Sequence, residues 1–235
     1  MKFQEVMTEL ESLGTEQTKK TLLRHGAVEP LFGVKVGDMK SLRKILNNNH
    51  EIALELYATG NSDAMYLAGL VADQKKVTKA ELNRWVKEAT WSLISGTAVA
   101  ALAAESKHGF DLAQKWIDSQ NELIAAAGWH TLTHWLSIVD NDKVDLDEIR
   151  GLLKRVSLEI HAELNQVKSA MNGFLIAAGS YFPELTGLTK TLAREIGKIK
   201  VDKGDTSCKT PDALAYIEKI EKMNRVGKKR KSARC

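Results

Sequence analysis

The chain reads Arg84-Trp85-Val86 and repeats this pattern further on as Lys115-Trp116-Ile117. An Ala-rich stretch follows each copy, from Trp91 to Ala104 and from Asn121 to Leu136. A period of about thirty to forty residues for each pair of helices is typical of helical-repeat solenoids. Small Ala side chains also let neighbouring helices approach closely. The pattern predicts an all-α fold, a curved α-α superhelix of antiparallel helix pairs, with a compact globular bundle as the alternative.

Helical periodicity extends on both sides of this repeat. Two sets of apolar residues occupy the i, i+3, i+4 and i+7 positions of one helix face: Leu82, Trp85, Val86 and Ala89, and Ile149, Leu152, Leu153 and Val156. Helix starts are indicated where a capping residue precedes Glu by three positions: Thr78, Ser119 and Asp145. The short run Ile199-Lys200-Val201 is the one stretch that resembles a strand.

Positive charge is concentrated at the C-terminal end. The chain carries 34 Lys and Arg against 30 Asp and Glu, yet residues 217–235 alone contain eight basic and two acidic residues. A near-neutral body with a cationic end favours a polyanionic partner, because Lys and Arg release condensed counterions from nucleic acid. A disordered, solubilising tail is the competing interpretation. We therefore divide the chain into a helical-repeat domain, residues 1–226, and a basic C-terminal tail, residues 227–235.

Several classes of protein are disfavoured by the composition. The polar start Met1–Glu5 does not resemble a secretory signal, and no apolar stretch is long enough to span a bilayer. The two cysteines, Cys208 and Cys235, are too few for a disulfide framework, so we expect a reducing cytoplasm. His130 and His134 share a helix face, but Thr131 stands where a zincin needs Glu, so we expect no metal. No Gly-rich phosphate loop is present, and we expect no cofactor.

Five tryptophans stand out: Trp85, Trp91, Trp116, Trp129 and Trp135. Most large aromatic side chains of this kind fill the core between helices. The functional alternative is that one or two face a groove and stack on nucleotides. Trp91 and Trp129 lie in the two repeat-related stretches and are the better candidates for that role.

Three groups of residues resemble the DNA alkylation repair family, the AlkD-like helical-repeat proteins. The stretch Phe32-Gly33-Val34-Lys35-Val36-Gly37-Asp38-Met39-Lys40-Ser41-Leu42 is similar to its opening motif. Residues 50–57 and 63–68 are similar to the helix pair that follows. The C-terminal motifs resemble a subgroup: Val201-Asp202-Lys203-Gly204-Asp205, Cys208-Lys209-Thr210-Pro211, Tyr216-Ile217-Glu218-Lys219 and Gly227-Lys228-Lys229-Arg230-Lys231.

This resemblance implies HEAT-like helix pairs whose basic concave face binds duplex DNA, including alkylated or distorted duplex DNA. Characterised family members remove cationic N3- and N7-alkylated purines, stabilising the developing sugar cation with a carboxylate and aromatic faces. The family's Trp-Asp-x-x-Asp segment corresponds here to Ser95-Gly96-Thr97-Ala98-Val99, and no Asp or Glu occurs from Ala89 to Ala104. The catalytic residue therefore stays unassigned, and another acid, such as Glu105 or Asp111, is the alternative for that role.

By the same resemblance, the Arg that follows the family's Ser-x-Asn motif corresponds to Ala126 in this sequence. A later Trp of the family corresponds to Gly173 or Phe174. We expect a DNA-binding protein whose glycosylase activity is weak or altered. A non-catalytic helical-repeat scaffold for a protein partner is the alternative. The candidate DNA-binding residues are Lys35, Trp91, Trp129, Lys168, Lys228, Lys229, Arg230 and Lys231.

Overall fold

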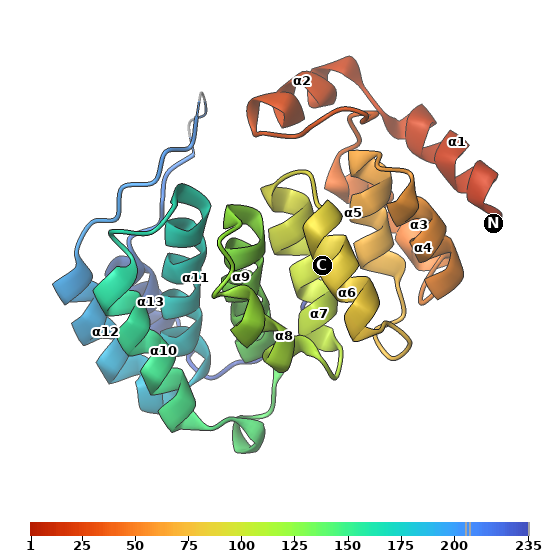
Figure 1. Ribbon diagram of the computed structural model, residues 1–235. Coiled ribbons are helices and arrows are strands. Elements are labelled where there is room, and N and C mark those ends of the chain that lie inside the picture. The colour runs from red at the N-terminus through yellow and green to blue at the C-terminus, as the bar shows by residue number, and fades with distance from the viewer. Residues whose placement is uncertain (205, 207, 235) are drawn as a thin grey trace.

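A computed structural model describes residues 1–204, 206 and 208–234. Helices dominate this described part of the chain, and no strand occurs in it, so Ile199–Val201 is extended backbone without a strand partner. The predicted all-α superhelix of HEAT-like helix pairs is confirmed (Figure 1). Asp205, in the motif quoted above, and Cys235 lie outside the described residues.

The helices form successive pairs along the chain. The pairs are α4 (His50–Ala58) with α5 (Ser62–Val71), α6 (Lys79–Glu88) with η2 (Ile94–Val99) and α7 (Ala100–Glu105), α8 (Gly109–Trp116) with α9 (Glu122–Ile138), and α10 (Leu146–Glu159) with α11 (Asn165–Tyr181). The N-terminal end adds α1 (Phe3–Leu13), α2 (Glu16–Arg24), η1 (Val36–Met39) and α3 (Lys40–Ile45). The short η3 (Asn141–Lys143), α12 (Pro183–Ile196) and α13 (Ala213–Lys222) complete the fold.

One inner layer runs through the whole stack. Helices α5, η2–α7, α9 and α11 pack side by side, while α4, α6, α8 and α10 lie outside them. Because each inner helix follows an outer one antiparallel to it, the four inner helices point the same way. Their N-terminal ends therefore gather at one edge of the stack and their C-terminal ends at the other.

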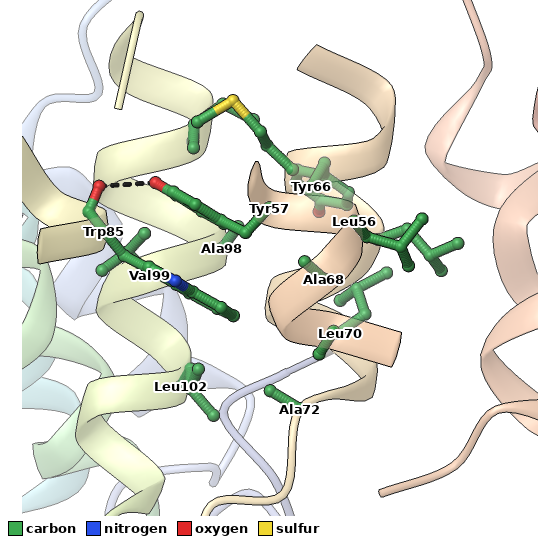
Figure 2. Packing of buried hydrophobic residues seen from close by; sticks show 14 of the residues in the cluster. Leu56, Tyr57, Tyr66, Ala68, Leu70, Ala72, Trp85, Ala98, Val99 and Leu102 are labelled. Atoms are coloured by element: carbon green, nitrogen blue, oxygen red, sulfur yellow. Dashed lines mark hydrogen bonds between the residues drawn. The ribbon is translucent and has the colours of Figure 1, made fainter. Parts of the chain in front are cut away.

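Close approach between inner helices depends on small residues. A Cβ added at Gly69 of α5 would lie 2.7 Å from the Cβ of Ala98 in η2. Apolar side chains fill the remaining space, and Figure 2 shows part of this packing. The Tyr57 ring stacks on Trp85 with centroids 4.0 Å apart, and its hydroxyl donates to the Trp85 carbonyl at 2.5 Å. The Ala-rich repeat therefore serves close packing, as the sequence predicted.

The C-terminal segment 227–234 crosses the C-terminal edge of the inner layer. Its backbone donates to Ser180 of α11 and to Ser137 of α9, and the Arg234 side chain donates to Gly69, Leu70 and Ala72 at the end of α5. Carbonyl groups at a helix C-terminus lack partners within the helix and carry partial negative charge. The basic segment thus satisfies these carbonyls and ties the last repeat to the first half of the stack.

Candidate nucleic-acid interface

A cleft of about 710 Å³ lies at the opposite edge, beside three of the inner segments, η2, α9 and the N-terminal end of α11. Its walls come from segments far apart in the chain: α2, the segment 91–97 that leads into η2, the middle of α9, the first two turns of α11, and the loop that follows α12. The lining residues from these five segments include Arg24, His25, Trp91, Thr97, His130, Ser169, Asp202, Lys203 and Cys208. In Figure 1 this loop and α2 both lie at the upper edge of the stack.

Aromatic and imidazole rings line the inner part of the cleft. Trp91 is 7 % exposed, and its indole Nε1 has no hydrogen-bond partner among the described residues. His130 lies against Gly96, where an added Cβ would come within 2.6 Å of the His130 Cδ2 atom. Burial, with the nearby His134, lowers the pKa of His130 to about 3. Burial lowers the pKa of His134 to about 4, despite its ring hydrogen bond to the Gly96 carbonyl. Both rings are therefore neutral at pH 7.

The segment η2 is a π-helical turn, which is wider than an α-helical turn and often occurs at functional sites. Ser95–Val99, the stretch predicted to correspond to the family's carboxylate-bearing segment, lies within η2. Thr97 is the residue of the stretch that lines the cleft. The position that faces the cleft from this helix thus carries a hydroxyl.

Cationic residues stand on both sides of the cleft. Arg24 lines it from α2, and Lys203 lines it from the loop after α12. The Lys203 ammonium donates to the Ser169 hydroxyl at 3.0 Å, which holds it beside the first turns of α11. The cationic side chains and the positive ends of the helix dipoles share this edge, and both attract phosphate groups.

Asp202 is the one acidic residue among the described residues that line the cleft. Its carboxylate accepts from the Gly204 backbone at 2.8 Å, and its backbone exchanges two hydrogen bonds with the Asn165 side chain, at 2.7 and 2.5 Å. The carboxylate therefore holds the loop turn. The other acids considered from the sequence, Glu105 and Asp111, do not line the cleft. Glu105 pairs with Arg234 at 2.7 Å, and Asp111 pairs with Lys79 at 3.0 Å.

The mouth of the cleft is bridged by a histidine and a cysteine. His25, at the end of α2, places Nε2 3.8 Å from the Sγ of Cys208 in the loop. A hydrogen bond from His25 lowers the pKa of the Cys208 thiol, with a further contribution from the Thr206 hydroxyl. The pKa of His25 is raised, first by its hydrogen bond to the Thr21 carbonyl and then by Cys208.

The predicted tryptophans separate into two environments. Trp91 lines the cleft, whereas Trp129 has no exposed surface and packs against Phe174 with ring centroids 5.2 Å apart. With its whole surface covered, Trp129 has no face on which a base could stack in this conformation. Lys35 is exposed just before η1, and Lys168 is half-buried on α11 beside Ser169.

The predicted basic cluster of the tail lies away from the cleft, at the C-terminal edge of the inner layer. Lys229 is half-buried: its ammonium donates to the Leu136 carbonyl at 2.9 Å and lies 3.4 Å from the centre of the Phe182 ring. Burial lowers the pKa of Lys229 to about 8. Lys228, Arg230 and Lys231 are exposed and stay candidates for contact with DNA.

Sequence reasoning missed the residues that bridge the cleft. Arg24, His25, His130 and Lys203 were not predicted as site residues. The motifs around Lys203 and Cys208 carried the resemblance to a subgroup, but no local pattern indicates that this loop meets α2. His130 was examined as a metal ligand, and among the described residues no three His, Cys, Asp or Glu side chains converge as a metal-binding group.

Comparison with known proteins identifies the family. The sequence model described as "DNA alkylation repair enzyme" matches residues 6–187. The chain belongs to the DNA alkylation repair family. It is 34% identical over 230 residues to the uncharacterized protein Lin0241 of Listeria innocua, covering 95% of this chain and 98% of the relative. It is 32% identical to the uncharacterized protein Lmo0209 of Listeria monocytogenes, covering 92% of this chain and 96% of the relative.

This family member also resembles a solved structure along its whole length. The similar protein represents "a new family of proteins related to the HEAT-like repeat DNA glycosylases with affinity for branched DNA structures". The two chains superpose with a TM-score of 0.93 and are 38% identical, with all of each chain covered. No helix in the part of the chain that the structure describes is long and apolar enough to cross a membrane.

Proposed function

We propose that this family member binds DNA in the cleft and prefers branched DNA to a continuous duplex. The observation that carries this proposal is the composition of the cleft, which Arg24 of α2 and Lys203 of the loop after α12 line together with Trp91. Cations attract the phosphate backbone, and an aromatic face stacks on an unpaired base without reading its identity. The affinity for branched DNA of the similar solved protein supports the same assignment.

The size and closure of the cleft support the preference for a branch point. A volume of about 710 Å³ is within the range of pockets that hold a small ligand, about 300–1,000 Å³. The contact between His25 and Cys208 joins its two walls. A few unpaired nucleotides fit such a space better than stacked base pairs do, and junctions offer unpaired or easily unstacked nucleotides at their centre.

We further propose that excision of alkylated purines by this chain is weak. A glycosylase of this family's kind stabilises a developing positive charge on the sugar, for which a nearby carboxylate is the natural partner. Of the lining residues that the structure describes, Asp202 alone is acidic, and its carboxylate accepts a hydrogen bond from the loop backbone. The cleft is therefore better suited to holding DNA than to breaking a glycosidic bond.

The test is a comparison of affinities for a labelled four-way junction and for a linear duplex of matched arm length and composition, at several salt concentrations. We expect tighter binding of the junction by about tenfold, which corresponds to about 1.4 kcal/mol, with affinity falling steeply as salt rises. Equal affinities would contradict the branch preference. Binding to neither DNA, with salt-insensitive capture of a protein partner, would favour the scaffold alternative.

A further inference from the structure

The pair formed by His25 and Cys208 is not explained by DNA binding. The two residues are 183 positions apart, and the thiol is exposed at the mouth of the cleft. Attraction of phosphates needs neither a thiol nor a histidine at this point. A chemical role other than DNA binding is therefore needed to explain the pair.

The geometry fixes the tautomer of the neutral His25 ring. The Nδ1 atom of His25 lies 2.8 Å from the Thr21 carbonyl, which can only accept, so Nδ1 carries a proton. The remaining ring nitrogen, Nε2, faces the Sγ of Cys208 at 3.8 Å. In the neutral pair Nε2 accepts from the thiol. Transfer of that proton makes a thiolate beside an imidazolium, the arrangement that activates a cysteine nucleophile.

The surroundings of the sulfur favour the thiolate. The Cys208 backbone donates to the Thr206 hydroxyl at 3.3 Å, and both that hydroxyl and the charge of Lys203 stabilise negative charge on sulfur. On the other wall, Arg24 opposes protonation of His25, but the Thr21 carbonyl outweighs it. Among the described residues, the side chains that act on the sulfur are those of His25, Thr206 and Lys203, and none of them is acidic.

We propose that Cys208 and His25 form a reactive thiolate–imidazolium pair, a covalent modification site for soft electrophiles whose modification opens the mouth of the cleft. With a haloacetamide, the sulfur lone pair forms the S–C bond, the C–halogen bond breaks, halide leaves, and the imidazolium keeps its proton. The product is a neutral thioether that no longer pairs with His25. No residue of α2 is fully buried. Leu22 packs against the core and Lys19 pairs with Glu29 at 2.9 Å, and the contact between His25 and Cys208 holds the C-terminal end of α2 at the cleft.

The first measurement follows the rate of iodoacetamide reaction with Cys208 against pH, with Cys235→Ser as the background so that one thiol reacts. A thiolate of low pKa is also a weaker nucleophile, so the rate at high pH is a poor readout. The midpoint of the profile is the decisive quantity. We expect it below the ordinary thiol value of about 8.5, and we expect His25→Gln to return it to about that value.

Lys20→Gln is the matched control, because it removes a positive charge from the exposed surface of the same helix. This variant should leave the midpoint in place. A midpoint at the ordinary value in the Cys235→Ser background, or one that His25→Gln does not move, would overturn the thiolate pair. Circular dichroism confirms that each variant keeps the helical fold.

The second measurement is limited trypsin digestion before and after the alkylation, since α2 contains Lys19, Lys20 and Arg24. Cleavage within α2 should accelerate several-fold after modification in the Cys235→Ser protein. It should not change in a Cys208→Ser, Cys235→Ser protein given the same reagent. Equal cleavage before and after modification would overturn the opening of the mouth. Both measurements use protein without DNA, so their outcomes do not depend on whether the proposed function is correct.

Discussion

Arg234 and Glu105, 129 residues apart in the sequence, form a nearly buried ion pair with 2.7 Å between the guanidinium Nε and the carboxylate Oε2. The second oxygen of Glu105 accepts from the Ser232 hydroxyl at 2.6 Å and from the Ala233 backbone at 2.7 Å. Burial raises the pKa of Glu105, but the Ser232 hydrogen bond and the Arg234 charge outweigh burial and hold that pKa below its usual range. Two cations of the C-terminal segment, Arg234 and Lys229, thus serve the fold.

Arg234→Ala should lower the free energy of unfolding by about 3–5 kcal/mol, because it leaves the Glu105 carboxylate half-buried without its partner. Urea denaturation measures the change. Lys231→Ala is the control, since Lys231 is exposed on the same segment and should change stability by less than about 0.5 kcal/mol. Equal effects of the two substitutions would mean that the segment does not tie the repeats together.

Gly96→Ala should destabilise the protein by about 1–3 kcal/mol, because the new methyl group on η2 would lie 2.6 Å from the His130 ring of α9. Gly151→Ala is the matched control in the middle of α10, where an added Cβ meets nothing within 4 Å. It should stabilise by about 0.5–1 kcal/mol through helix propensity. Thermal unfolding of both variants gives the comparison, and a neutral Gly96→Ala would show that η2 readily moves away from His130.

Stability should fall as pH falls from about 6.5 toward 4. His130 and His134 have pKa values of about 3 and 4 in the folded protein, below the ordinary value of about 6.5. Over this range the unfolded chain binds protons that the folded protein does not, so acid favours unfolding. Each histidine adds up to about 1.4 kcal/mol per pH unit. Urea titrations at several pH values should show a shallower dependence for His134→Asn, and an unchanged slope would contradict the burial of that ring.

Release of N7-methylguanine and N3-methyladenine from methylated duplex DNA should be slow in single-turnover assays. We expect rates about a hundred- to a thousandfold below those of a family member with the central carboxylate, the usual effect of losing one preorganised electrostatic partner. Binding to distorted DNA should persist, since phosphate contacts do not need the acid. Comparable rates for the two proteins would show that another group stabilises the sugar cation.

Local sequence patterns predicted the helices well because the signals are local. The apolar positions Leu82, Trp85 and Val86 are all buried on α6, and Thr78 caps that helix in a reciprocal capping box with Glu81. The prediction for α9 was wrong by two residues. Asn121 is its N-cap and accepts from Leu123 and Ile124, while Ser119 accepts from the Asn121 backbone.

The cleft was beyond prediction from sequence because its walls meet only in three dimensions. Periodicity cannot indicate that α2 faces the loop carrying Lys203 and Cys208. The same limit applies to Trp91 and Trp129, which look equivalent in the repeat, although one lines the cleft and the other is fully buried. Charge patterning is ambiguous in the same way. In the sequence, a Lys that donates to helix carbonyls, such as Lys229, cannot be distinguished from a Lys that binds phosphate.

The most direct test of the account compares the salt dependence of four-way junction binding for two double variants. Arg24→Ala with Lys203→Ala removes the cations of the cleft, and Lys228→Ala with Lys231→Ala removes exposed cations of the tail. Each lost phosphate contact lowers the slope of log affinity against log salt by about one unit. We predict a slope lower by about two units and weaker binding for the cleft variant, with a change of less than about one unit for the tail variant. The claim that this cleft holds DNA would be contradicted if the slope decreased more for the tail variant than for the cleft variant, and if the cleft variant bound the junction as tightly as the wild type does.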